Sequence, residues 1–508
     1  MLSRVYSFAL NGLEGIPLTI EVDIQTGLPG VDIVGLADTA VKESKERVRS
    51  AIKNSGYKYP IASVIVNLAP ADIKKEGSMY DLPIALGILQ SCSTIVCDKI
   101  NEYIILGELS LNGDVKHVNG ILPMLISAKQ LGYKNVIVPK ENSKEASFTQ
   151  GLKVFAVDSL RETIEFLTNQ TELTPIETDG WKNDTSITYD NDIKYIKGQY
   201  SAKRAMEIAV SGGHNILLIG PPGAGKTMLA RAVPSIMPDL TFDEALEIAK
   251  IYSVAGLLDD GMIRVRPFRS PHHTATTVAL VGGGAKIKPG EISLAHYGVL
   301  FLDELPEYTR QSLETLRQPL EDGVITISRA QGTITYPSNF ILIASMNPCP
   351  CGNFGSANQV CTCTASQIVK YMRKLSAPLL DRIDIHIEVD NIEYSQLVSQ
   401  NEEESSSSVK LRVNSARKIQ ATRFINSTHH CNAQLTSAEI KKYCKLDQES
   451  DNLLRQAFER LKLSARAYNR ILKVARTIAD LDNSNDILPS HIAEAIQYRS
   501  LDRKFGVM

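Results

Sequence analysis

The sequence lacks the features that would place the protein in a membrane or outside the cell. In its 508 residues no apolar run reaches the ~18 residues that a membrane-spanning helix needs. Asn11 and Glu14 interrupt the N-terminal segment, so it does not form the apolar core of a signal peptide. The chain has eight cysteines, four of them clustered, which does not fit a secreted disulfide framework. These absences predict a cytoplasmic protein with no membrane partner.

The chain also lacks an excess of charge of either sign. Its 55 basic and 57 acidic side chains leave a formal net charge of −2, so no global basic field indicates nucleic-acid binding. Any such contact would therefore come from a local patch or a pore. A chain of 508 residues is too long for a single core, and about three domains are expected.

Changes of pattern divide the chain into three folded parts. Residues 1–168 alternate short strands with amphipathic helices, which predicts a compact α/β domain. A polar, turn-rich linker covers 169–192, and residues 193–392 alternate strands with helices, as in a parallel sheet covered on both faces. Residues 393–508 have helical periodicity, and the low-complexity run 401–408 near their start predicts an exposed connection. The predicted fold class is α/β with a helical C-terminal domain.

The most informative stretch is the eight-residue run from Gly220 to Thr227, which fits the P-loop pattern. A predicted strand, residues 215–219, precedes it, and a predicted helix, residues 228–233, follows it. Glycines let backbone N–H groups converge on phosphate oxygens, Lys226 would reach the β- and γ-phosphates, and Thr227 would offer its hydroxyl to Mg²⁺. The predicted nucleotide-binding residues are Gly220, Pro221, Pro222, Gly223, Ala224, Gly225, Lys226, Thr227 and Met228.

Two later strands end in polar residues that suit ATP hydrolysis. The apolar strand 298–302 leads into Asp303, which can hold Mg²⁺, and Glu304, which can orient and deprotonate the attacking water. A further apolar strand, residues 340–344, is followed by Asn347, whose amide could bridge the γ-phosphate and that water. Without the first two motifs, Asn347 would be an asparagine that closes a strand into a turn. Together the motifs predict an ATPase that uses ATP and Mg²⁺.

Two arginine segments complete the order of motifs. Arg382 lies between two acids and taken alone would be half of a surface ion pair. After the other motifs it resembles the arginine finger of AAA+ rings, which completes the neighbouring subunit's site. Arg466 best fits the sensor-2 position of a helical lid, and Arg470, one turn later, is the alternative. This order is that of AAA+ ATPases, and a finger that acts in trans requires a homo-oligomeric ring, which we expect to be a hexamer.

Several longer segments resemble the Mg-chelatase-like AAA+ proteins that include YifB and ComM. The segments are residues 196–205, 268–273, 289–293, 301–306 and 474–481. The resemblance covers essentially the whole chain and implies that Gly198 and Gln199 lie beside the adenine. It also implies a DNA motor for branch migration of recombination intermediates, including DNA taken up by transformation. The alternative is a chelatase-like or protein-remodelling ATPase, which the absence of an Asp-x-Ser-x-Ser sequence mildly disfavours; a nucleotide-gated scaffold is disfavoured by Glu304.

The first domain resembles the proteolytic domain of Lon, on a ribosomal-S5-like α/β fold. Residues 107–122 follow the Lon segment that delivers the catalytic lysine, and residues 75–81 follow the segment that delivers the serine. Leu122 stands at the lysine position and Met79 at the serine position. Because a methionine cannot attack a carbonyl and a leucine cannot accept a proton, the domain is predicted to be a catalytically degenerate scaffold.

This domain leaves one alternative open, a protease that uses Ser78 with Lys74 or Lys75. A Ser–Lys dyad needs a lysine whose pKa is lowered by burial and which lies within hydrogen-bond reach of the serine hydroxyl. Ser78 is one position early in the segment, so its side chain is expected to point elsewhere.

Two loop segments are candidates for holding a polymer. Residues 281–290 are glycine-rich and carry Lys286 and Lys288, which could contact phosphates, and residues 321–335 predict a β-hairpin with Arg329 near its turn. They resemble the helix-2 insert and the pre-sensor-1 hairpin of ring helicases such as the MCM proteins, which grip DNA in a central pore. This implies contacts with single-stranded or branched DNA that weaken with salt and show little sequence preference. The alternative is ordinary solvated loops.

Cys349, Cys351, Cys361 and Cys363 form a Cys-x-Cys…Cys-x-Cys set directly after Asn347. Four thiolates in a reducing compartment suit tetrahedral Zn²⁺, which would pin the loop between the sensor asparagine and the arginine finger. The spacing is tighter than that of the common Cys-x₂-Cys knuckle, so free or redox-active thiols are the alternative.

Overall fold

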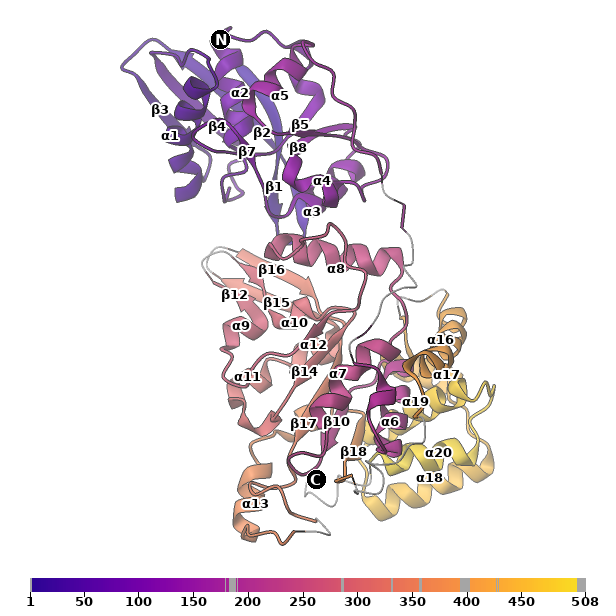
Figure 1. Cartoon of the computed structure of the whole chain (residues 1–508). Helices are drawn as coiled ribbons and strands as arrows, with labels where there is room; N and C mark the ends of the chain where they lie inside the picture. Colours follow the sequence, from indigo (N-terminus) through magenta and orange to yellow (C-terminus); the bar gives the residue numbers. More distant parts are fainter. Residues whose placement is uncertain are drawn as a thin grey trace. The chain divides into compact units, whose positions relative to one another are not determined.

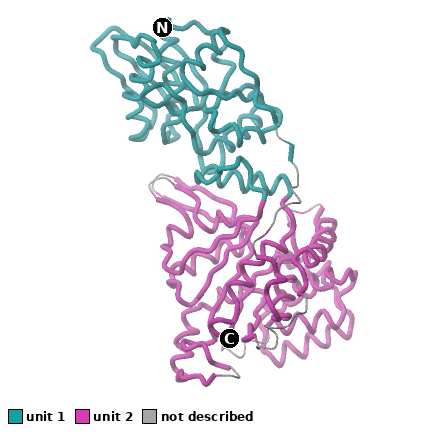
Figure 2. The backbone as a smooth tube through the Cα atoms, in the orientation of Figure 1, with its two compact units in different colours: residues 1–183, 241–264 teal, residues 184–240, 265–508 magenta. Residues whose placement is uncertain are grey.

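The computed structural model divides into two compact units (Figure 2). Unit 1 comprises Met1–Asn183 and Thr241–Arg264, and unit 2 comprises Asp184–Leu240 and Val265–Met508. Within the described ranges, every helix is too short or too polar to cross a lipid bilayer. The structure describes residues 2–178, 180–181, 189, 191–284, 287–329, 332–355, 359–392, 403–425, 427 and 429–499.

Unit 1 is built on a seven-stranded mixed sheet (Figure 1). Its strands are β1 (Ser3–Asn11), β2 (Glu14–Gln25), β3 (Gly30–Val34), β4 (Ser63–Ala69), β5 (Tyr103–Ile105), β8 (Asn135–Pro139) and β9 (Lys153–Val157). Their order is β3-β4-β2-β1-β5-β8-β9, and a small hairpin pairs β6 (Glu108–Leu109) with β7 (Val115–Lys116). In β2, the side chains of Leu18, Ile20 and Val22 are buried and alternate with partly exposed polar ones, as the sequence pattern predicts.

The helices of unit 1 pack against this sheet or against one another. They are α1 (Thr39–Asn54), α2 (Asp81–Ser91), α3 (Ile121–Gln130), α4 (Ser143–Ala146), α5 (Leu160–Leu167) and α8 (Phe242–Ala255), with short 3₁₀ helices at Asp98–Glu102 and Lys140–Asn142. Helix α8 lies within the range 193–392 expected for the ATPase core, yet it packs on α3 in unit 1. Ile248 and Ile251 of α8 are buried, and the Ser253 carbonyl accepts a hydrogen bond from the Gly120 N–H at 3.1 Å. The predicted domain boundaries themselves stay a prediction.

Unit 2 contains the parallel sheet expected from the alternation of strands and helices. Its strands are β10 (Ile216–Ile219), β11 (Phe268–Arg269), β14 (Val299–Leu302), β17 (Ile341–Met346) and β18 (Ile385–Glu388). They lie in the order β11-β14-β17-β10-β18, and each neighbouring pair is parallel. Every residue of β10, β14 and β17 is buried, which is typical of strands covered on both faces. The predicted α/β fold class is confirmed.

The remaining elements of the unit 2 core surround this sheet. The helices are α6 (Tyr200–Gly212), α7 (Lys226–Ile236), α9 (Thr277–Val281), α10 (Glu291–Leu294), α11 (Arg310–Glu314), α12 (Arg317–Asp322), α13 (Ala365–Met372) and α14 (Ala377–Leu380), with 3₁₀ turns at Ile193–Tyr195 and Leu305–Glu307. Two ribbons pair β12 (Gly282–Gly283) with β13 (Lys288–Pro289) and β15 (Val324–Arg329) with β16 (Gly332–Pro337). The second is antiparallel, with Arg329 opposite Gly332, so the predicted hairpin is confirmed.

The C-terminal part of unit 2 is helical, as predicted. It contains α16 (Ser406–Arg423), α17 (Ser437–Tyr443), α18 (Gln448–Leu461), α19 (Ala465–Leu481) and α20 (Pro489–Gln497), with a 3₁₀ turn at Asn432–Gln434. Helix α16 begins inside the run 401–408, so the residues from Ser406 on belong to a helix and not to the expected connection, although Ser407 and Ser408 are exposed. The serines of this run have specific roles: Ser405 caps the helix, and Ser406 is buried, with its hydroxyl donating to Asp192 at 2.9 Å.

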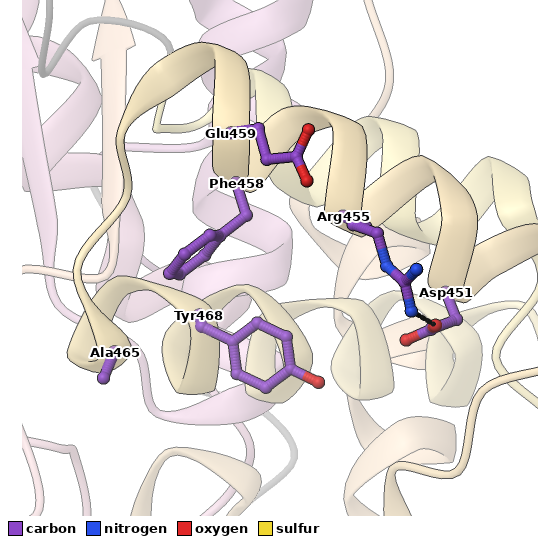
Figure 3. Close-up of a pocket in the computed structure, with 6 residues that line it drawn as sticks. All are labelled: Asp451, Arg455, Phe458, Glu459, Ala465 and Tyr468. Carbon is purple, nitrogen blue, oxygen red and sulfur yellow. Dashed lines mark ion pairs between the residues drawn. The ribbon is translucent and has the colours of Figure 1, made fainter.

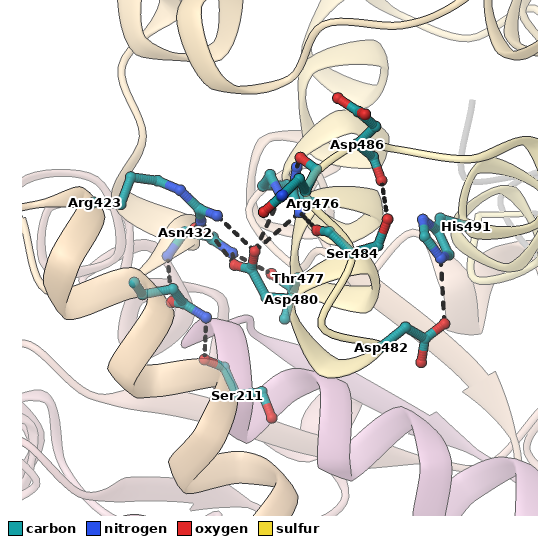
Figure 4. Close-up of polar contacts among 12 residues, drawn as sticks. Ser211, Arg423, Asn432, Arg476, Thr477, Asp480, Asp482, Ser484, Asp486 and His491 are labelled. Atoms are coloured by element: carbon teal, nitrogen blue, oxygen red, sulfur yellow. Dashed lines mark hydrogen bonds and ion pairs between the residues drawn. The ribbon is translucent and has the colours of Figure 1, made fainter.

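A buried polar network ties these helices to one another (Figure 4). Asp480 on α19 is fully buried, and its carboxylate pairs with Arg423 at 2.6 Å and with Arg476 at 3.1 Å. Asn432 donates to the same carboxylate at 2.8 Å. Gln420 extends the network to the core, because its amide donates to the carbonyl of Ser211 in α6 at 3.0 Å. Removing one partner of such a buried ion pair costs about 3–5 kcal/mol, so this network fixes the C-terminal helices to one another and to α6.

Candidate active site

The P-loop forms the turn from β10 into α7. Gly223 and Gly225 have φ angles of +80° and +87°, in the left-handed region that glycine adopts without a steric penalty. Gly220 is needed for a different reason, because a Cβ at this position would lie 2.2 Å from the carbonyl oxygen of Val389. The strand, loop and helix predicted around this motif are all present, and the helix begins at Lys226.

The buried amine of Lys226 is held at the centre of this loop. Its Nζ donates to the carbonyl oxygens of Gly220 at 2.6 Å and Pro221 at 2.8 Å, and to Asn347 Oδ1 at 3.1 Å. Burial lowers the pKa of Lys226, and the negative charges of Asp303 and Glu304 oppose this effect. The structure thus brings the P-loop lysine and the predicted sensor asparagine into direct contact.

Thr227 and Asp303, the predicted Mg²⁺ residues, also meet. The Thr227 hydroxyl donates to Asp303 Oδ2 at 2.8 Å. The second oxygen, Oδ1, accepts hydrogen bonds from the Ser345 hydroxyl and from the Glu304 N–H. This happens because β10, β14 and β17 are parallel neighbours, so their carboxyl ends lie at one edge of the sheet. A hydroxyl beside a carboxylate fits a hard divalent cation such as Mg²⁺. Ser345 is a residue of this site that the sequence reasoning missed.

Glu304 has an unusual backbone conformation at the end of β14. Its φ angle is +52°, which is uncommon for a residue with a Cβ, and its side chain is 58% exposed. The carboxylate lies 3.6 Å from Nδ1 of His273, and the His273 ring packs against His272 with 4.1 Å between ring centroids. The sequence reasoning gave His273 no role at this site, since it lies in a separate segment and its position beside Glu304 depends on the pairing of β11 with β14.

Gly198 and Gln199 border the P-loop from the start of α6. The Gln199 side-chain amide donates to the carbonyls of Ala224 at 3.3 Å and Asp390 at 2.5 Å. The Gly198 N–H donates to Glu403 Oε1 at 3.0 Å. Their place beside the loop fits the expected adenine side of the site, and that role stays a prediction.

Arg382 lies at the opposite edge of the sheet from the P-loop of its own chain. It precedes β18, which is parallel to β10 with Ile216 opposite Ile385. The Arg382 carbonyl accepts a hydrogen bond from Asn215 Nδ2 at 3.0 Å, and Asn215 directly precedes β10, whereas Lys226 comes after it. A strand of four residues spans about 13 Å. The backbone of Arg382 is therefore separated from the phosphate-binding loop of the same chain by about the length of β10.

The two sensor-2 candidates lie at that same edge as Arg382. Arg466, at the start of α19, is 64% exposed and approaches Asp381 at 3.8 Å. Arg470 is mostly buried and pairs with Asp384. Burial would raise the pKa of Asp384, but the charges of Arg470 and His214 lower it below its ordinary value. Arg470 is thus engaged within the fold, whereas Arg466 presents its guanidinium to the same face as Arg382.

The four clustered cysteines converge as their spacing suggests. Their sulfur atoms all lie within 4.8 Å of one another, with Cys349 at 3.3 Å from Cys351 and 3.7 Å from Cys361. A tetrahedral zinc with Zn–S bonds of about 2.3 Å requires sulfur separations of about 3.8 Å, so the donor set fits this ion. Backbone N–H groups of Asn353 and Thr362 lower the pKa of Cys351 to about 5. These hydrogen bonds favour a thiolate at Cys351, the form that binds zinc, whereas burial raises the pKa of Cys363.

The cysteine loop contacts the P-loop through Gly352. This glycine has a φ angle of +83°, and a Cβ placed on it would lie 2.5 Å from Cδ of Pro222. The loop that carries Cys349 and Cys351 therefore packs against the phosphate-binding loop itself.

The residues predicted to contact DNA lie on the two small ribbons. Lys288 is exposed in β13 and pairs with Gly283 of β12. Arg329 is exposed at the end of β15, and its guanidinium lies 3.3 Å from the position of a Cβ built on Gly283. Lys288 and Arg329 thus come together beside Gly283, while Lys286 lies outside the described residues.

In unit 1, Leu122 and Met79 occupy apolar surroundings at the positions expected for a Ser–Lys dyad. Leu122 is fully buried, and Met79 packs against the buried apolar residues of the unit. The Ser78 hydroxyl donates to Glu108, the Lys74 amine pairs with Glu76, and the buried Lys75 amine donates to the Pro70 carbonyl. Each of these three side chains thus pairs with a residue outside the set of Ser78, Lys74 and Lys75. The predicted absence of protease activity stays a prediction.

A surface pocket of about 370 Å³ lies between α18 and α19 (Figure 3). Phe458 and Tyr468 form its apolar floor, and an ion pair of 3.5 Å between Arg455 and Asp451 borders it. Its lining residues are distinct from those predicted for the ATP site.

This geometry defines an AAA+ ATPase core. A P-loop follows the strand β10, an Asp-Glu pair follows β14, an asparagine follows β17, an arginine precedes β18, and a helical domain completes the unit. The side chains of Lys226, Thr227, Asp303 and Asn347 meet at one edge of a parallel sheet, where α/β proteins bind nucleotides.

Comparison with known proteins agrees with this class and narrows it. Residues 192–397 match the family described as magnesium chelatase, subunit ChlI. Residues 20–142 match the family described as subunit ChlI of Mg-chelatase, and residues 403–499 match the family described as magnesium chelatase, subunit ChlI C-terminal. YifB of Escherichia coli K12 is 45% identical, over 99% of this chain and 98% of that protein. The competence protein ComM of Haemophilus influenzae is 43% identical over the same shares. Lon protease 2 of Bacillus subtilis is 34% identical over 180 residues, 31% of this chain and 32% of that protein.

The chain therefore belongs to the Mg-chelatase-like AAA+ family of YifB and ComM. Membership implies ATPase activity with ATP and Mg²⁺, which fits the contacts of Lys226, Thr227 and Asp303.

Proposed function

We propose that this protein is the subunit of a cytoplasmic ATP-driven hexameric ring that moves or remodels DNA during recombination or natural transformation. In each site, Lys226 contacts the β- and γ-phosphates, Thr227 and Asp303 hold Mg²⁺, and Asn347 senses the γ-phosphate. Glu304 orients and deprotonates the attacking water, and its contact with His273 directs the carboxylate.

The position of Arg382 is the observation that supports assembly into a ring. It lies at the amino edge of the sheet, with β10 between it and the P-loop of its own chain. An arginine that stabilises the transferring phosphoryl group must touch that group, so Arg382 acts on the site of a neighbouring subunit. Arg466 lies at the same edge, and we propose that it enters the same neighbouring site. A head-to-tail contact of this kind forms a ring when the rotation between neighbouring subunits closes.

Two observations support DNA as the substrate. Lys288 and Arg329 come together, exposed, on neighbouring ribbons, and such cations suit the phosphodiester backbone. The name of the Haemophilus influenzae relative, competence protein ComM, points to a role in competence. Binding through phosphates would show little sequence preference and would weaken steeply with salt.

The test is the steady-state ATPase rate of the full chain with and without single-stranded or branched DNA. We expect stimulation by DNA and a gel shift at low salt. Glu304→Gln should abolish turnover while ATP binding remains, because the P-loop contacts are unchanged. If no DNA stimulates the ATPase and no gel shift appears at low salt, the DNA motor is wrong. The chelatase-like or protein-remodelling ATPase, which the match to ChlI over residues 192–397 favours, would then be the better proposal.

We also propose that Cys349, Cys351, Cys361 and Cys363 bind one structural Zn²⁺. The sulfur separations support it, and the contact of Gly352 with Pro222 would let the metal brace the P-loop. Metal analysis should find about one zinc per chain. Cys351→Ser should lose it, whereas Cys92→Ser, outside the cluster, should retain it. A zinc-free wild-type protein purified without chelator would favour free or redox-active thiols.

A further inference from the structure

Arg382 does not point freely into solvent but is held by Glu321. The guanidinium pairs with the Glu321 carboxylate through Nη2 and donates to the Pro378 carbonyl through Nη1 at 2.6 Å. The Arg382 side chain is only 11% exposed, whereas Glu321 is 60% exposed. Among the residues that the structure describes, Glu321 is thus the anionic partner of the finger, and it is accessible to solvent.

Glu321 lies at the base of the β15–β16 hairpin. It is in the last turn of α12, which ends at Asp322; Gly323 caps the helix, and β15 begins at Val324. The hairpin closes at this point, because the Ser338 N–H donates to the Gly323 carbonyl at 2.8 Å. Gly323 has a φ angle of +66°, in the left-handed region that favours glycine, and a Cβ there would also displace the Asn339 side chain. Motion of the hairpin as a body would therefore be transmitted directly to the residue that holds Arg382.

Several arginine side chains also act on the Glu321 carboxylate. Its hydrogen bond to Arg382 and the charges of Arg382, Arg466 and Arg317 lower its pKa, so the carboxylate is ionised at neutral pH. A carboxylate bound to Arg382 occupies the donors that a phosphate would use. To act on a neighbouring γ-phosphate, Arg382 must exchange one anion for the other.

We propose that Glu321 is a positioning residue that restrains Arg382 until the β15–β16 hairpin engages DNA. Displacement of the hairpin withdraws the carboxylate and releases the guanidinium to the phosphate of the neighbouring subunit. This inference rests on the proposed function, in which Arg382 acts in trans and the hairpin contacts DNA. The ion pair between Arg382 and Glu321 then couples DNA binding to ATP hydrolysis.

The test compares ATPase rates of full-length wild type, Glu321→Gln and Glu321→Asp, each with and without a single-stranded oligonucleotide. Glu321→Gln keeps the shape of the side chain but removes the charge, so the rate without DNA should rise about two- to fivefold, the population change that an ion pair with one solvent-exposed partner supports. The stimulation ratio should fall toward one, while Glu321→Asp should restore part of it. Asp322→Asn, which neutralises the next residue of α12, is the matched control and should behave as wild type.

The outcomes separate this inference from the function on which it rests. A wild type stimulated by DNA, with the same ratio in Glu321→Gln, would overturn the coupling and leave the DNA motor standing. A loss of activity in Glu321→Gln equal with and without DNA would also overturn it, since Glu321 would then only support the productive position of Arg382. If DNA does not stimulate the wild type, the proposed function and the coupling both fail.

Discussion

Mixing two inactive variants tests whether Arg382 completes the site of a neighbouring subunit. Arg382→Ala removes the finger but leaves the P-loop, and Lys226→Ala removes the P-loop lysine but leaves the finger. Each variant alone should lose about 10³–10⁵-fold in kcat, the contribution that an arginine finger makes to phosphoryl transfer. The structure supports this because the strand β10 lies between Asn215, which binds the Arg382 carbonyl, and the P-loop.

The ATPase activity expected in mixed rings follows from which subunit supplies each residue of a site. In a ring assembled from equal amounts of both variants, a site is complete only where an Arg382→Ala subunit supplies Lys226 and its Lys226→Ala neighbour supplies Arg382. With random assembly this occurs at about one quarter of the interfaces, so about one quarter of the wild-type ATPase rate should return. An arginine that acted within its own chain would give no recovery, because every subunit would carry one defect.

The assay is steady-state phosphate release after the two variants are mixed, with native mass spectrometry to confirm that mixed rings form. Arg373→Ala, at an exposed arginine after α13, is the matched control and should keep the wild-type rate. Mixed rings without recovered activity would refute the reasoning, and so would an Arg382→Ala variant that hydrolyses ATP at the wild-type rate by itself.

Two further predictions concern the cysteine loop and unit 1. Gly352→Ala, at a φ of +83°, should cost about 1–3 kcal/mol and raise the KM for ATP, because its Cβ would displace Pro222. Gly355→Ala, at a φ of +79° in the same loop, is the control, and an equal KM in both variants would contradict the contact. Burial raises the pKa of Glu145 from its ordinary 4.5 to about 7, so between these values unfolding releases a proton and the free energy of unfolding falls by about 3 kcal/mol as pH rises. Thermal unfolding from pH 4 to pH 8 should show this decline in wild type and not in Glu145→Gln; identical profiles would refute it.

Much of the ATPase core was predictable from the sequence because its signals are local. Glycines at fixed spacing before a helix predict a P-loop, and an apolar run that ends in Asp303 and Glu304 predicts a strand that delivers them to the sheet edge. The hairpin around Arg329 and the convergence of the four cysteines were likewise predictable, since turn residues and ligand spacing act over a few positions.

The contacts that tune these groups were not predictable, because they join segments far apart in the sequence. Ser345 reaches Asp303 and His273 reaches Glu304 only because neighbouring parallel strands bring them together. Helix α8 packs in unit 1 because its buried face matches α3, and chain position gave no sign of this.

The sequence by itself thus determined the class of chemistry, since residue types at fixed spacing are sufficient to specify phosphate and metal ligands. Only the tertiary structure decided where Arg382 lies and what holds it. The direction of β18 and its pairing with β10 place that arginine at the far edge of the sheet, and the packing of α12 brings Glu321 to it. Strand pairing and helix packing are set by burial summed over the whole domain, which no local pattern records.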